Sequence, residues 1–568
     1  MVIKTVFYLF VFLGLVCSLS YAQGPIGQPT GRPSEEQLPI PEGQPAPAPR
    51  IQLPMPPPPA ETPGIRPSVT AFITQVKIAG STVFTAEELG RVTAPYTNRS
   101  LTSEDLEALR VAVTVFYVNH GYVNSGAVIP DQAITDGVLT LQIIEGRLTR
   151  IDVEGNRLFR SGYLRDRIEL PAGTPLNIKK LQGKLQILQQ DERIEVVNAN
   201  VRPGSKPGEA VIDVKVKEAD AFRAYFEYNN YQTPTVGAEL GMLTLQHLSL
   251  TGNGDILSFG YGGSEGIDPR IETYYSFPFN RYDGTFTVYY QKNDFKVIEQ
   301  PFKDLDIESR SDIVGVTVRQ PVYRTVQNEV ALGVTGERIY NRTYLLDEPF
   351  SFYPGVEDGR SVVTAIRFFQ EWFHREASQF IALRSRFSFG ISALESTINS
   401  NNLPDSRFFE WLVQGRWAFR HWPFNMETFV RVDAQLTPDS LLPVEQMAIG
   451  GRYTVRGYRE SQLVRDNGVS ASIETRFPLA RNKPWASILD ICAFYDFGHA
   501  WNTDLPSPEP RTLDSVGLGI RWALDRPWQT HFTPQFELYW GIPLRNVETA
   551  GGDLQDSGIH FRFLLMYW

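Results

Sequence analysis

The pattern of apolar and polar residues divides the chain into three parts. A short apolar run lies near the amino terminus, a mixture of helical and alternating spacing runs from residue 70 to 219, and alternation alone runs from residue 220 to 568. Helical spacing predicts amphipathic helices, whereas alternation predicts half-buried strands. The sequence therefore predicts a mixed α+β region followed by a long all-β region, and 568 residues leave room for several domains.

The all-β region consists of alternating runs of about ten residues, the length of a tilted strand that crosses a membrane. Clusters of Gly, Asp, Asn and Pro separate about sixteen such runs. One face of each run is apolar and aromatic, and the other is charged. Within residues 410–435 the apolar face holds Trp411, Val413, Trp417, Phe419, Val430, Val432 and Ala434, and the charged face holds Glu410, Gln414, Arg416, Arg431, Asp433 and Gln435.

This contrast between the two faces is typical of a barrel wall between lipid and water. A large soluble β protein is the alternative, but it would not need so many charges on one face and so many aromatic residues on the other. We therefore predict an all-β transmembrane barrel of about sixteen antiparallel strands over residues 220–568. The last run, FRFLLMYW, ends in the aromatic Trp568 and is apolar on both faces, so alternation does not assign its lipid-facing side.

Two related small domains precede the barrel. ITQVKIAGSTVF at residues 73–84 recurs as LTRIDVEGNRLF at residues 148–159, a period of 75 residues. Each copy predicts a strand, two helices and two strands, over residues 70–147 and 148–219. In the first copy, Thr85 and Glu88 form a capping box. The helical faces are marked by Leu106, Leu109, Val113 and Phe116 in the first copy and by Leu181, Leu185 and Leu188 in the second. Such an α+β unit leaves a free sheet edge that an extended chain can join.

The amino terminus resembles an export signal. Lys4 supplies a positive charge, an apolar run follows, and Ala22 ends a small-residue cleavage pattern, so residues 1–22 are predicted to be a signal peptide. A membrane anchor is the alternative, but the run is shorter than the roughly 20 residues that a spanning helix needs. Residues 23–69 are rich in Pro, Gly and Gln and predict an extended linker without a core of its own.

Composition and motifs argue against several other functions. The net charge of -10 and the pI near 5.4 exclude a basic surface for nucleic acid. The seven His residues show no metal-ligand spacing. Gly262 to Gly266 fits the hydrolase pattern G-x-S-x-G around Ser264, but that motif needs a helix directly after it, and a strand-like run follows instead. We therefore predict no enzymatic activity, no catalytic residue, no cofactor and no metal site.

Two short stretches stand out within the all-β region. GGRYTVRGY carries one central cation, Arg456, and FYDFG carries one anion, Asp496, within an alternating run. A surface arginine and a turn aspartate would be the ordinary interpretation of each residue alone. The flanking glycines favour a specific contact, because they let the backbone approach a wall closely. We expect Arg456, on a long loop, to meet Asp496 on the barrel wall. The candidate residues are Gly450, Gly451, Val455, Arg456, Gly457 and Tyr458 on the loop, and Phe494, Asp496 and Gly498 on the wall.

These motifs, together with HGYVNSGAVIPDQAITDGVLTLQIIEG at residues 120–146, resemble those of the haemolysin secretion/activation family, the transporter half of two-partner secretion systems. The resemblance extends from about Phe72 to Trp568. It implies a sixteen-stranded outer-membrane barrel with two periplasmic POTRA domains. It also implies that the loop holding Val455 to Tyr458 folds back into the pore. A count of the alternating runs places Arg456 between strands eleven and twelve and Asp496 in strand thirteen, which agrees with the family's arrangement. Family members often have an amino-terminal helix that plugs the pore, but Pro33 to Pro39 is a poor helix candidate here.

The resemblance implies that the POTRA domains recognise an unfolded exported partner, which then passes through the barrel. The expected partners are a large adhesin- or haemolysin-like protein and outer-membrane lipid, with no nucleic acid, and the transporter is expected to be a monomer. A barrel-assembly factor is the alternative function, although such factors normally carry more POTRA domains. An exported enzyme is a further alternative, which the missing catalytic constellation disfavours.

Overall fold

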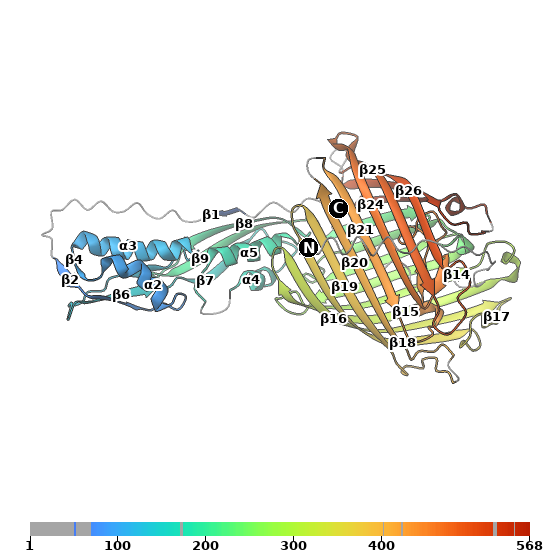
Figure 1. Ribbon diagram of the computed structural model, residues 1–568, viewed down its shortest axis with the longest axis horizontal. Helices are drawn as coiled ribbons and strands as arrows, with labels where there is room; N and C mark the ends of the chain where they lie inside the picture. Colours follow the sequence, from blue (N-terminus) through green and yellow to red (C-terminus); the bar gives the residue numbers. More distant parts are fainter. Residues whose placement is uncertain are drawn as a thin grey trace, which may run out of the picture.

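The computed structural model shows two small α+β domains in a row, followed by a wide closed barrel (Figure 1). It describes residues 50–52, 70–170, 174–400, 403–421, 424–525, 531–549 and 551–567. The predicted signal peptide and the segment Pro33 to Pro39 lie outside these residues. No helix within the described ranges is long and apolar enough to span a bilayer.

The first domain packs two helices against a three-stranded sheet in the order β3-β6-β5. Its elements are β2 (Ala71–Ile73), β3 (Gln75–Ala79), α2 (Ala86–Thr93), β4 (Arg99–Leu101), α3 (Ser103–Asn119), β5 (Gly126–Val128) and β6 (Val138–Ile144). The predicted capping box is confirmed, because Thr85 and Glu88 bond reciprocally at the start of α2. In α3, Leu109 and Val113 are fully buried as predicted, and Tyr117 joins them, while Leu106 and Phe116 are only partly buried.

The second domain repeats this arrangement with longer strands. Its elements are β7 (Arg147–Glu154), α4 (Ser161–Ile168), α5 (Ile178–Gln189), β8 (Ile194–Pro203) and β9 (Glu209–Glu218). The predicted residues Leu181, Leu185 and Leu188 form the buried face of α5. The core of this domain lies between the two helices and the sheet.

One part of the predicted linker is described by the structure. Residues 50–52 form a short strand, β1 (Arg50–Gln52), which pairs in parallel with Asn198–Asn200 of β8. These three residues are extended, and the sequence did not predict that they pair with the second domain. An exposed strand edge offers unpaired backbone groups, and an extended segment can satisfy them without building a core. The second domain thus has its β8 edge covered, whereas β5 remains an outer strand of the first domain.

A carboxylate at the end of each domain's last strand fixes the turn that carries the sequence repeat. Glu145 accepts hydrogen bonds from the backbone N–H groups of Thr82 and Val83 at 2.7 and 3.0 Å. Glu218 does the same for Arg157 and Phe159 at 2.7 and 3.0 Å. The repeat therefore extends to a matched pair of carboxylates, which satisfy backbone donors that the turns would otherwise leave unpaired.

The barrel has sixteen antiparallel wall strands, as predicted, and it closes between β10 and β28. The wall strands are β10 (Phe222–Asn229), β11 (Leu240–His247), β12 (Ile256–Gly263), β13 (Ile267–Pro278), β14 (Thr285–Lys296), β15 (Ile307–Arg324), β16 (Asn328–Leu345), β18 (Arg360–Arg375), β19 (Gln379–Gly390), β20 (Phe409–His421), β21 (Met426–Leu436), β24 (Asn467–Lys483), β25 (Ala486–Trp501), β26 (Thr512–Ala523), β27 (Phe532–Pro543) and β28 (Ile559–Tyr567). The two-residue β17 (Glu348–Pro349) pairs antiparallel with the end of β16 and is not counted as a wall strand.

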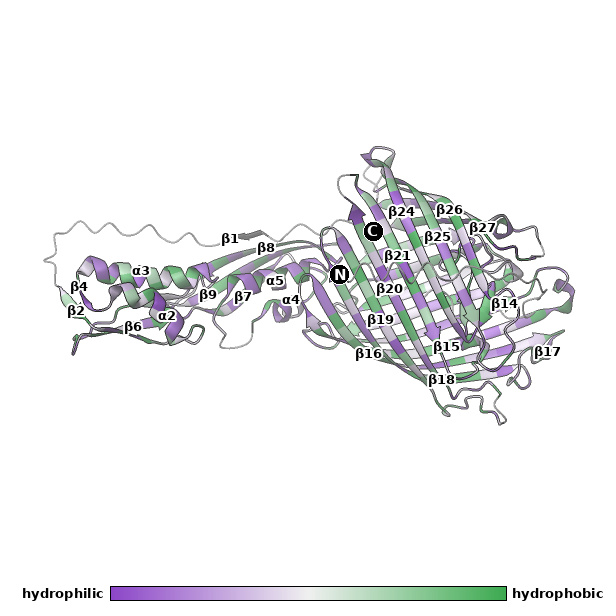
Figure 2. Cartoon of the chain, in the orientation of Figure 1, coloured by the Kyte–Doolittle hydropathy of each residue, from purple (hydrophilic) through white to green (hydrophobic). Residues whose placement is uncertain are grey.

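The alternation of side chains along the strands follows the prediction. Trp411 and Trp417 are exposed on the outer face, whereas Glu410 and Arg416 are buried in the lumen. Figure 2 shows the resulting alternation of apolar and polar residues along the wall strands. The structure also assigns the last strand: His560 is buried in the lumen, while Phe563 and Leu565 face the same side as their register partners Tyr228 and Phe226, which are exposed.

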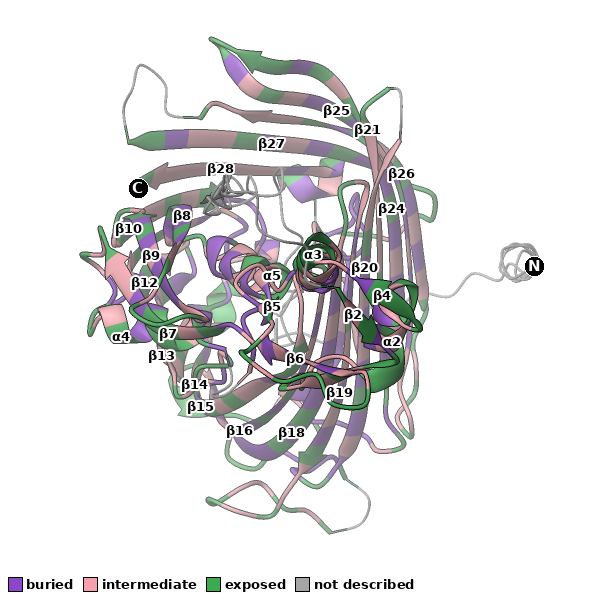
Figure 3. Cartoon of the chain, turned by 90° about the vertical axis from the view of Figure 1, so that its left-hand side faces the viewer, coloured by how far each residue is buried: buried purple, intermediate pink, exposed green. Residues whose placement is uncertain are grey.

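Ion pairs and hydrogen bonds attach the second domain to the turns at the near end of the barrel. Arg167 of α4 lies 2.8 Å from Asp283 in the turn between β13 and β14. Arg193 donates to the backbone oxygen of Gly254 at 2.7 Å, in the turn between β11 and β12. Seen from the side of the two small domains, α3 and α5 lie in front of the barrel (Figure 3). The two domains therefore stand directly beneath the pore.

The pair of carboxylates in the small domains generates a testable prediction. Glu145→Gln should weaken the turn of the first domain by about 1–3 kcal/mol, because backbone donors lose a charged acceptor. Hydrogen exchange of the Thr82 and Val83 amides, measured on the full chain, should become clearly faster. Glu87→Gln is the control, since Glu87 is 80% exposed and pairs only with Arg91. Unchanged exchange at Thr82 and Val83 would contradict this role.

Candidate functional site in the barrel lumen

The candidate site is a long loop that folds back into the barrel. Residues 437–466 connect β21 and β24, the eleventh and twelfth wall strands, and Asp496 lies in β25, the thirteenth. The loop contains a 3-10 turn (Pro443–Glu445) and a small ribbon of β22 (Met447–Ile449) and β23 (Leu463–Arg465). The order of loop and strand that the sequence predicted is therefore present.

The tip of the loop is shaped by two glycines and held by apolar packing. Gly450 and Gly451 have φ values of 121° and 88°, which favour glycine. The N–H of Gly451 donates to the backbone oxygen of Val455 at 3.0 Å and closes a tight turn. Val455 is fully buried in a cluster with Ile449, Tyr458, Met447, Leu463, Ala500 and Leu513. Packing thus positions the loop before any charge is considered.

Arg456 and Asp496 lie in direct contact within the lumen. The Arg456 Nε lies 2.7 Å from Asp496 Oδ2, and its Nη2 lies 2.9 Å from Oδ1, a two-pronged grip on the carboxylate. The backbone N–H of Arg456 also donates to Oδ2 at 3.0 Å. Both side chains are buried, with exposures of 1% and 0%. This geometry is one that lysine cannot reproduce.

Three further wall residues complete the surroundings of Arg456. Only one of them, Phe494, was predicted from the sequence, whereas Glu474 and Ser472 were not. Glu474 of β24 receives a hydrogen bond from Nη1 of Arg456, and Ser472 receives one from Nη2 at 3.2 Å. The predicted Phe494 lies beneath the guanidinium, with its ring centroid 3.5 Å from Cζ. A signal existed in the alternation of SASIETRF, which places Ser472 and Glu474 on one face. Nothing local indicated that this face meets the loop.

The glycines at the contact allow very close backbone approach. Gly457 has φ 93° and faces Gly541 of β27, where a Cβ on Gly457 would lie 2.9 Å from the carbonyl carbon of Gly541. Its N–H donates to Nε2 of His560 in β28 at 3.3 Å. A Cβ on Gly498 would lie 2.9 Å from Cγ2 of Val455. A side chain at Gly457 or Gly498 would therefore collide with its neighbours, and both glycines are needed for the loop to lie against the wall.

Tyr458, the last predicted loop residue, bonds to the opposite side of the contact. Its hydroxyl lies 3.0 Å from the backbone oxygens of Asp514 and Arg545, and it accepts from the N–H of Arg545 at 3.1 Å. The structure thus brings together all the predicted loop and wall residues, either in the Arg456 contact or in the packing around it.

Additional charge pairs hold the loop at other points of the wall. Arg452 lies 3.1 Å from Glu537 of β27. Glu445 is fully buried, and Arg367 of β18 lies 2.8 Å from it and 2.7 Å from Glu337 of β16. These contacts were not predicted, because charges alternate on every wall strand and the sequence does not show which of them a loop will meet.

Arg459 joins the pore loop to two other extracellular loops. Its Nε lies 2.6 Å from Asp556 in the loop between β27 and β28, and its Nη1 lies 2.7 Å from Glu299 in the loop between β14 and β15. Burial disfavours the charged form of Asp556, but hydrogen bonds from Arg459 and the backbone outweigh it and hold the pKa of Asp556 below its usual value. Arg459 therefore closes the outer end of the lumen around the loop.

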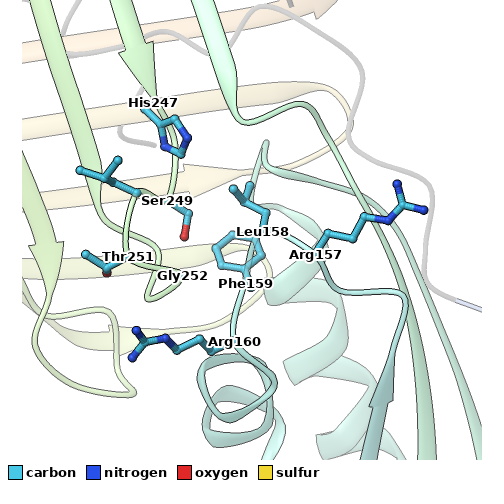
Figure 4. A pocket seen from close by; sticks show the side chains of 9 residues that line it. Arg157, Leu158, Phe159, Arg160, His247, Ser249, Thr251 and Gly252 are labelled. Atoms are coloured by element: carbon cyan, nitrogen blue, oxygen red, sulfur yellow. The ribbon is translucent and has the colours of Figure 1, made fainter.

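The remaining candidate features show no catalytic geometry. Ser264 donates to the backbone oxygen of Val236 at 2.7 Å and is followed by β13 rather than a helix. No group of His, Cys, Asp or Glu within the described residues could hold a metal ion. A cavity of about 400 Å³ lies between the second small domain and the turn after β11. Arg157 and Arg160 both line it, but their side chains point in different directions from each other (Figure 4). The lumen site can therefore bind and position a loop, and we see no bond-breaking chemistry in it.

Comparison with known proteins gives two family matches. Residues 208–522 match the haemolysin secretion/activation protein family ShlB/FhaC/HecB, and residues 71–146 match the ShlB-type POTRA domain. The chain is 23% identical over 476 residues to the outer membrane transporter CdiB of Dickeya dadantii, covering 79% of this chain and 80% of that protein. It is also 23% identical over 540 residues to the heme/hemopexin transporter HuxB of Haemophilus influenzae, covering 90% and 92%.

Solved structures resemble the fold. The structure of CdiB from Escherichia coli superposes with a TM-score of 0.67 at 20% identity, covering 90% of this chain and 93% of that one. BamA from Haemophilus ducreyi, lacking POTRA domains 1–3, superposes with a TM-score of 0.52 at 13% identity, covering 87% and 100%. At these identities the likeness concerns the fold alone.

The buried contact of Arg456 generates the second prediction. Arg456→Ala and Asp496→Ala should each impair export while the barrel still assembles, because each leaves a desolvated charge that costs about 3–5 kcal/mol, less where lumen water enters. The double variant should be little worse than either single one. Arg456→Lys should be clearly defective. The exchanged pair, Arg456→Asp with Asp496→Arg, should recover little, because it would place Glu474 beside a carboxylate.

Export and the melting temperature of the folded barrel measure this prediction. Arg420→Ala is the control, because Arg420 pairs with Glu427 on the wall and both are about one-third exposed, at 30% and 28%. Additive losses from Arg456→Ala and Asp496→Ala in both measurements would show that the two residues do not act as a pair.

Gly457 generates the third prediction. Gly457→Ala should displace the loop tip, because the added methyl group meets the Gly541 backbone and the positive φ disfavours alanine, with a cost of order 1–3 kcal/mol. Proteolysis of the loop in folded barrels should become faster. Gly336→Ala on β16 is the control, since a Cβ there would meet nothing within 4 Å. Equal proteolysis of the two variants would mean that the close approach of Gly457 is dispensable.

Proposed function

The protein belongs to the haemolysin secretion/activation family, the outer-membrane transporters of two-partner secretion, and on this basis we propose that its first POTRA domain captures the exported partner in an extended form. The transporter resides in the outer membrane, with both small domains in the periplasm. The observation that carries the proposal is an uncovered strand edge beside an exposed apolar helix face in that domain. The partner is a large adhesin- or haemolysin-like protein, exported by a monomeric transporter.

The strand edge belongs to β5, one of the two outer strands of the sheet. Ala127 of β5 donates its N–H to the hydroxyl of Thr114 on α3 at 3.1 Å, so this N–H is satisfied by a side chain. A side-chain acceptor is readily exchanged for the carbonyl oxygen of an added strand. The edge of β8 in the second domain, by contrast, is already paired with β1. The β8 edge is therefore closed to a guest strand, whereas no described strand pairs with the outer edge of β5.

The apolar helix face lies on α3, next to this edge. Val111, Val115 and Val118 are 41%, 46% and 40% exposed and stand at positions i, i+4 and i+7. This spacing places them along one side of the helix, opposite the buried Leu109, Val113 and Tyr117. Val128, at the end of β5, is 38% exposed. The valines give alternate side chains of an added strand an apolar surface to cover, and the edge supplies backbone hydrogen bonds.

Transport beyond the POTRA domains uses the barrel itself. The lumen is lined by polar and charged side chains, and the pore loop occupies it in this conformation. A partner segment passes once this loop is displaced. Folding of the partner outside, with no return path, gives the movement its direction without a nucleotide. The closed ring of sixteen strands comes from a single chain, which supports a pore in the monomer.

A barrel-assembly factor is the alternative function, favoured only by the fold likeness to BamA. Such a factor inserts clients into the membrane, so its clients would stay embedded there rather than be released outside the cell. The presence of two POTRA units and the match of the first to the ShlB-type domain favour secretion.

The fourth prediction tests capture by the first domain. Val115→Asp should strongly reduce the exported protein recovered outside cells of the native strain, because a charge on the helix face opposes an apolar guest. Deletion of residues 72–146 should abolish export while leaving a heat-modifiable barrel. Val196→Asp in the second domain is the control, since Val196 is also exposed, at 37%. Normal export by the deletion variant would rule out the docking role, and accumulation of a client in the membrane instead would favour the assembly factor.

A further inference from the structure

A row of arginines crosses three neighbouring wall strands on the outer face of the barrel. Arg310 of β15 lies directly opposite Arg342 of β16, and Arg342 lies directly opposite Arg360 of β18. Arg338 stands four residues before Arg342 on the same strand, and an even spacing places both on the same face. That face points outward, because Leu332 and Val334 on it are 37% and 45% exposed, whereas Thr335, on the other face of β16, is buried.

The arginine row lies immediately beyond the apolar band that contacts lipid tails. On β16 the outward residues run from Leu332 and Val334 to Arg338, then to Tyr340, Arg342 and Tyr344. β16 runs away from the POTRA domains and β15 and β18 run back toward them, so the end of β16 and the starts of β15 and β18 lie at the outer-leaflet end. Tyrosines at the boundary of an apolar band mark the level of lipid headgroups. The arginines therefore stand where lipid headgroups of the outer leaflet lie.

Like charges directly opposite each other on a sheet are destabilising, so this row needs an explanation. Arg342 makes no ion pair with any described residue, and its buried Nε has no hydrogen-bond partner. Both Arg310 and Arg342 lie near the ring of Tyr344, at 5.1 and 5.5 Å from its centroid. Arg338 donates to the backbone oxygen of Leu394 at 3.0 Å rather than to a carboxylate.

Nearby carboxylates do not neutralise the row. Glu308 lies 3.8 Å from both Arg310 and Lys296, so it is shared and distant. Asp312 lies on the same face and accepts the Tyr290 hydroxyl at 2.6 Å, and among the described residues it makes no ion pair with the row. Glu395 pairs with Arg360 at 3.1 Å, but it is 80% exposed on a loop. Arg338 and Arg342 therefore remain as unmatched cations between the apolar band and the outer solvent.

The loop that carries Glu395 extends over the same face. It connects β19 and β20, and its backbone bonds to β18, where the N–H of Thr397 donates to Val362 at 2.8 Å. Leu394 at its tip is 65% exposed beside Arg338. An apolar tip next to a cluster of cations matches a ligand that has both a charged head and an apolar body.

We propose that Arg310, Arg338 and Arg342 form a binding site for a phosphate-bearing lipid headgroup of the outer leaflet. Guanidinium groups bind phosphate oxygens through paired hydrogen bonds, and basic clusters at the membrane surface select anionic lipids. The acyl chains then lie along Leu332, Val334 and neighbouring outward residues, with Leu394 against their upper end. The bound lipid removes the repulsion along the row and ties β15, β16 and the β19–β20 loop together.

Native mass spectrometry of the full-length protein tests this site, with lipid A carrying two phosphates as the probe. The triple variant Arg310→Gln/Arg338→Gln/Arg342→Gln should bind it at least tenfold more weakly than the native protein. Lipid A without phosphates should bind both proteins equally weakly. The matched control is Arg91→Gln/Arg511→Gln/Arg545→Gln, which removes three exposed arginines that each pair with a carboxylate away from the row.

Several outcomes discriminate the sources of phosphate. Phosphatidylglycerol binding that depends on the same arginines supports the site and identifies the lipid as a phospholipid. Inorganic phosphate that displaces lipid A at equal concentration overturns the lipid assignment. Equal binding of lipid A by the triple variant and the native protein overturns the site itself. The lysine variant Arg310→Lys/Arg338→Lys/Arg342→Lys, checked for heat-modifiable folding, should retain intermediate binding, because lysine keeps the charge but loses the paired geometry.

Discussion

The buried guanidinium of Arg456 is the constraint on which the lumen is organised. A charge withdrawn from water must be compensated, and here Asp496, Glu474 and the ring of Phe494 surround it on three sides. These groups come from adjacent strands in fixed register, with Ser472 opposite Asp496 and Glu474 opposite Phe494. A one-residue slip of either strand would turn the carboxylates toward lipid. The position of the loop and the register of the wall therefore depend on each other.

The loop is held at several separate points around the lumen. Glu445 reaches Arg367 on β18, Arg452 reaches Glu537 on β27, and Arg459 reaches Asp556 and Glu299 in other loops. Each contact joins a charge on the loop to an opposite charge elsewhere, so moving the loop would expose unpaired charges at several sites together. These ion pairs fix one resting position of the loop. When a partner chain displaces the loop, the charges that are uncovered must bind water or charged groups of the passing chain.

The outer face of the barrel shows the opposite arrangement. In the lumen, loop arginines meet carboxylates, whereas on the outside Arg310, Arg342 and Arg360 face one another across strands. The lumen can be satisfied within the chain because loop and wall are both protein. On the outer face the β19–β20 loop supplies Glu395 to Arg360 but no carboxylate to Arg342, and the site that we propose there balances the remaining charge with a lipid headgroup. On both faces of the same strands the arginines need a negative partner, which is a carboxylate in the lumen and, in our proposal, a lipid phosphate outside.

Much of the fold was determined by the sequence alone, because it rests on local periodicity. Alternation predicted the wall strands and the faces of Trp411 and Glu410, and the repeat at residues 73–84 and 148–159 predicted two equivalent α+β domains. The contact of Arg456 with Asp496 came from glycine-flanked motifs and family resemblance. Tertiary structure alone decided that Glu474 shares Arg456, that Glu445 and Arg459 anchor the loop, that β1 covers β8 and that Phe563 faces outward. These features depend on which distant segments of the chain meet in space. Polar residues alternate in the same way on every wall strand, so the local sequence does not show which of them will contact the loop.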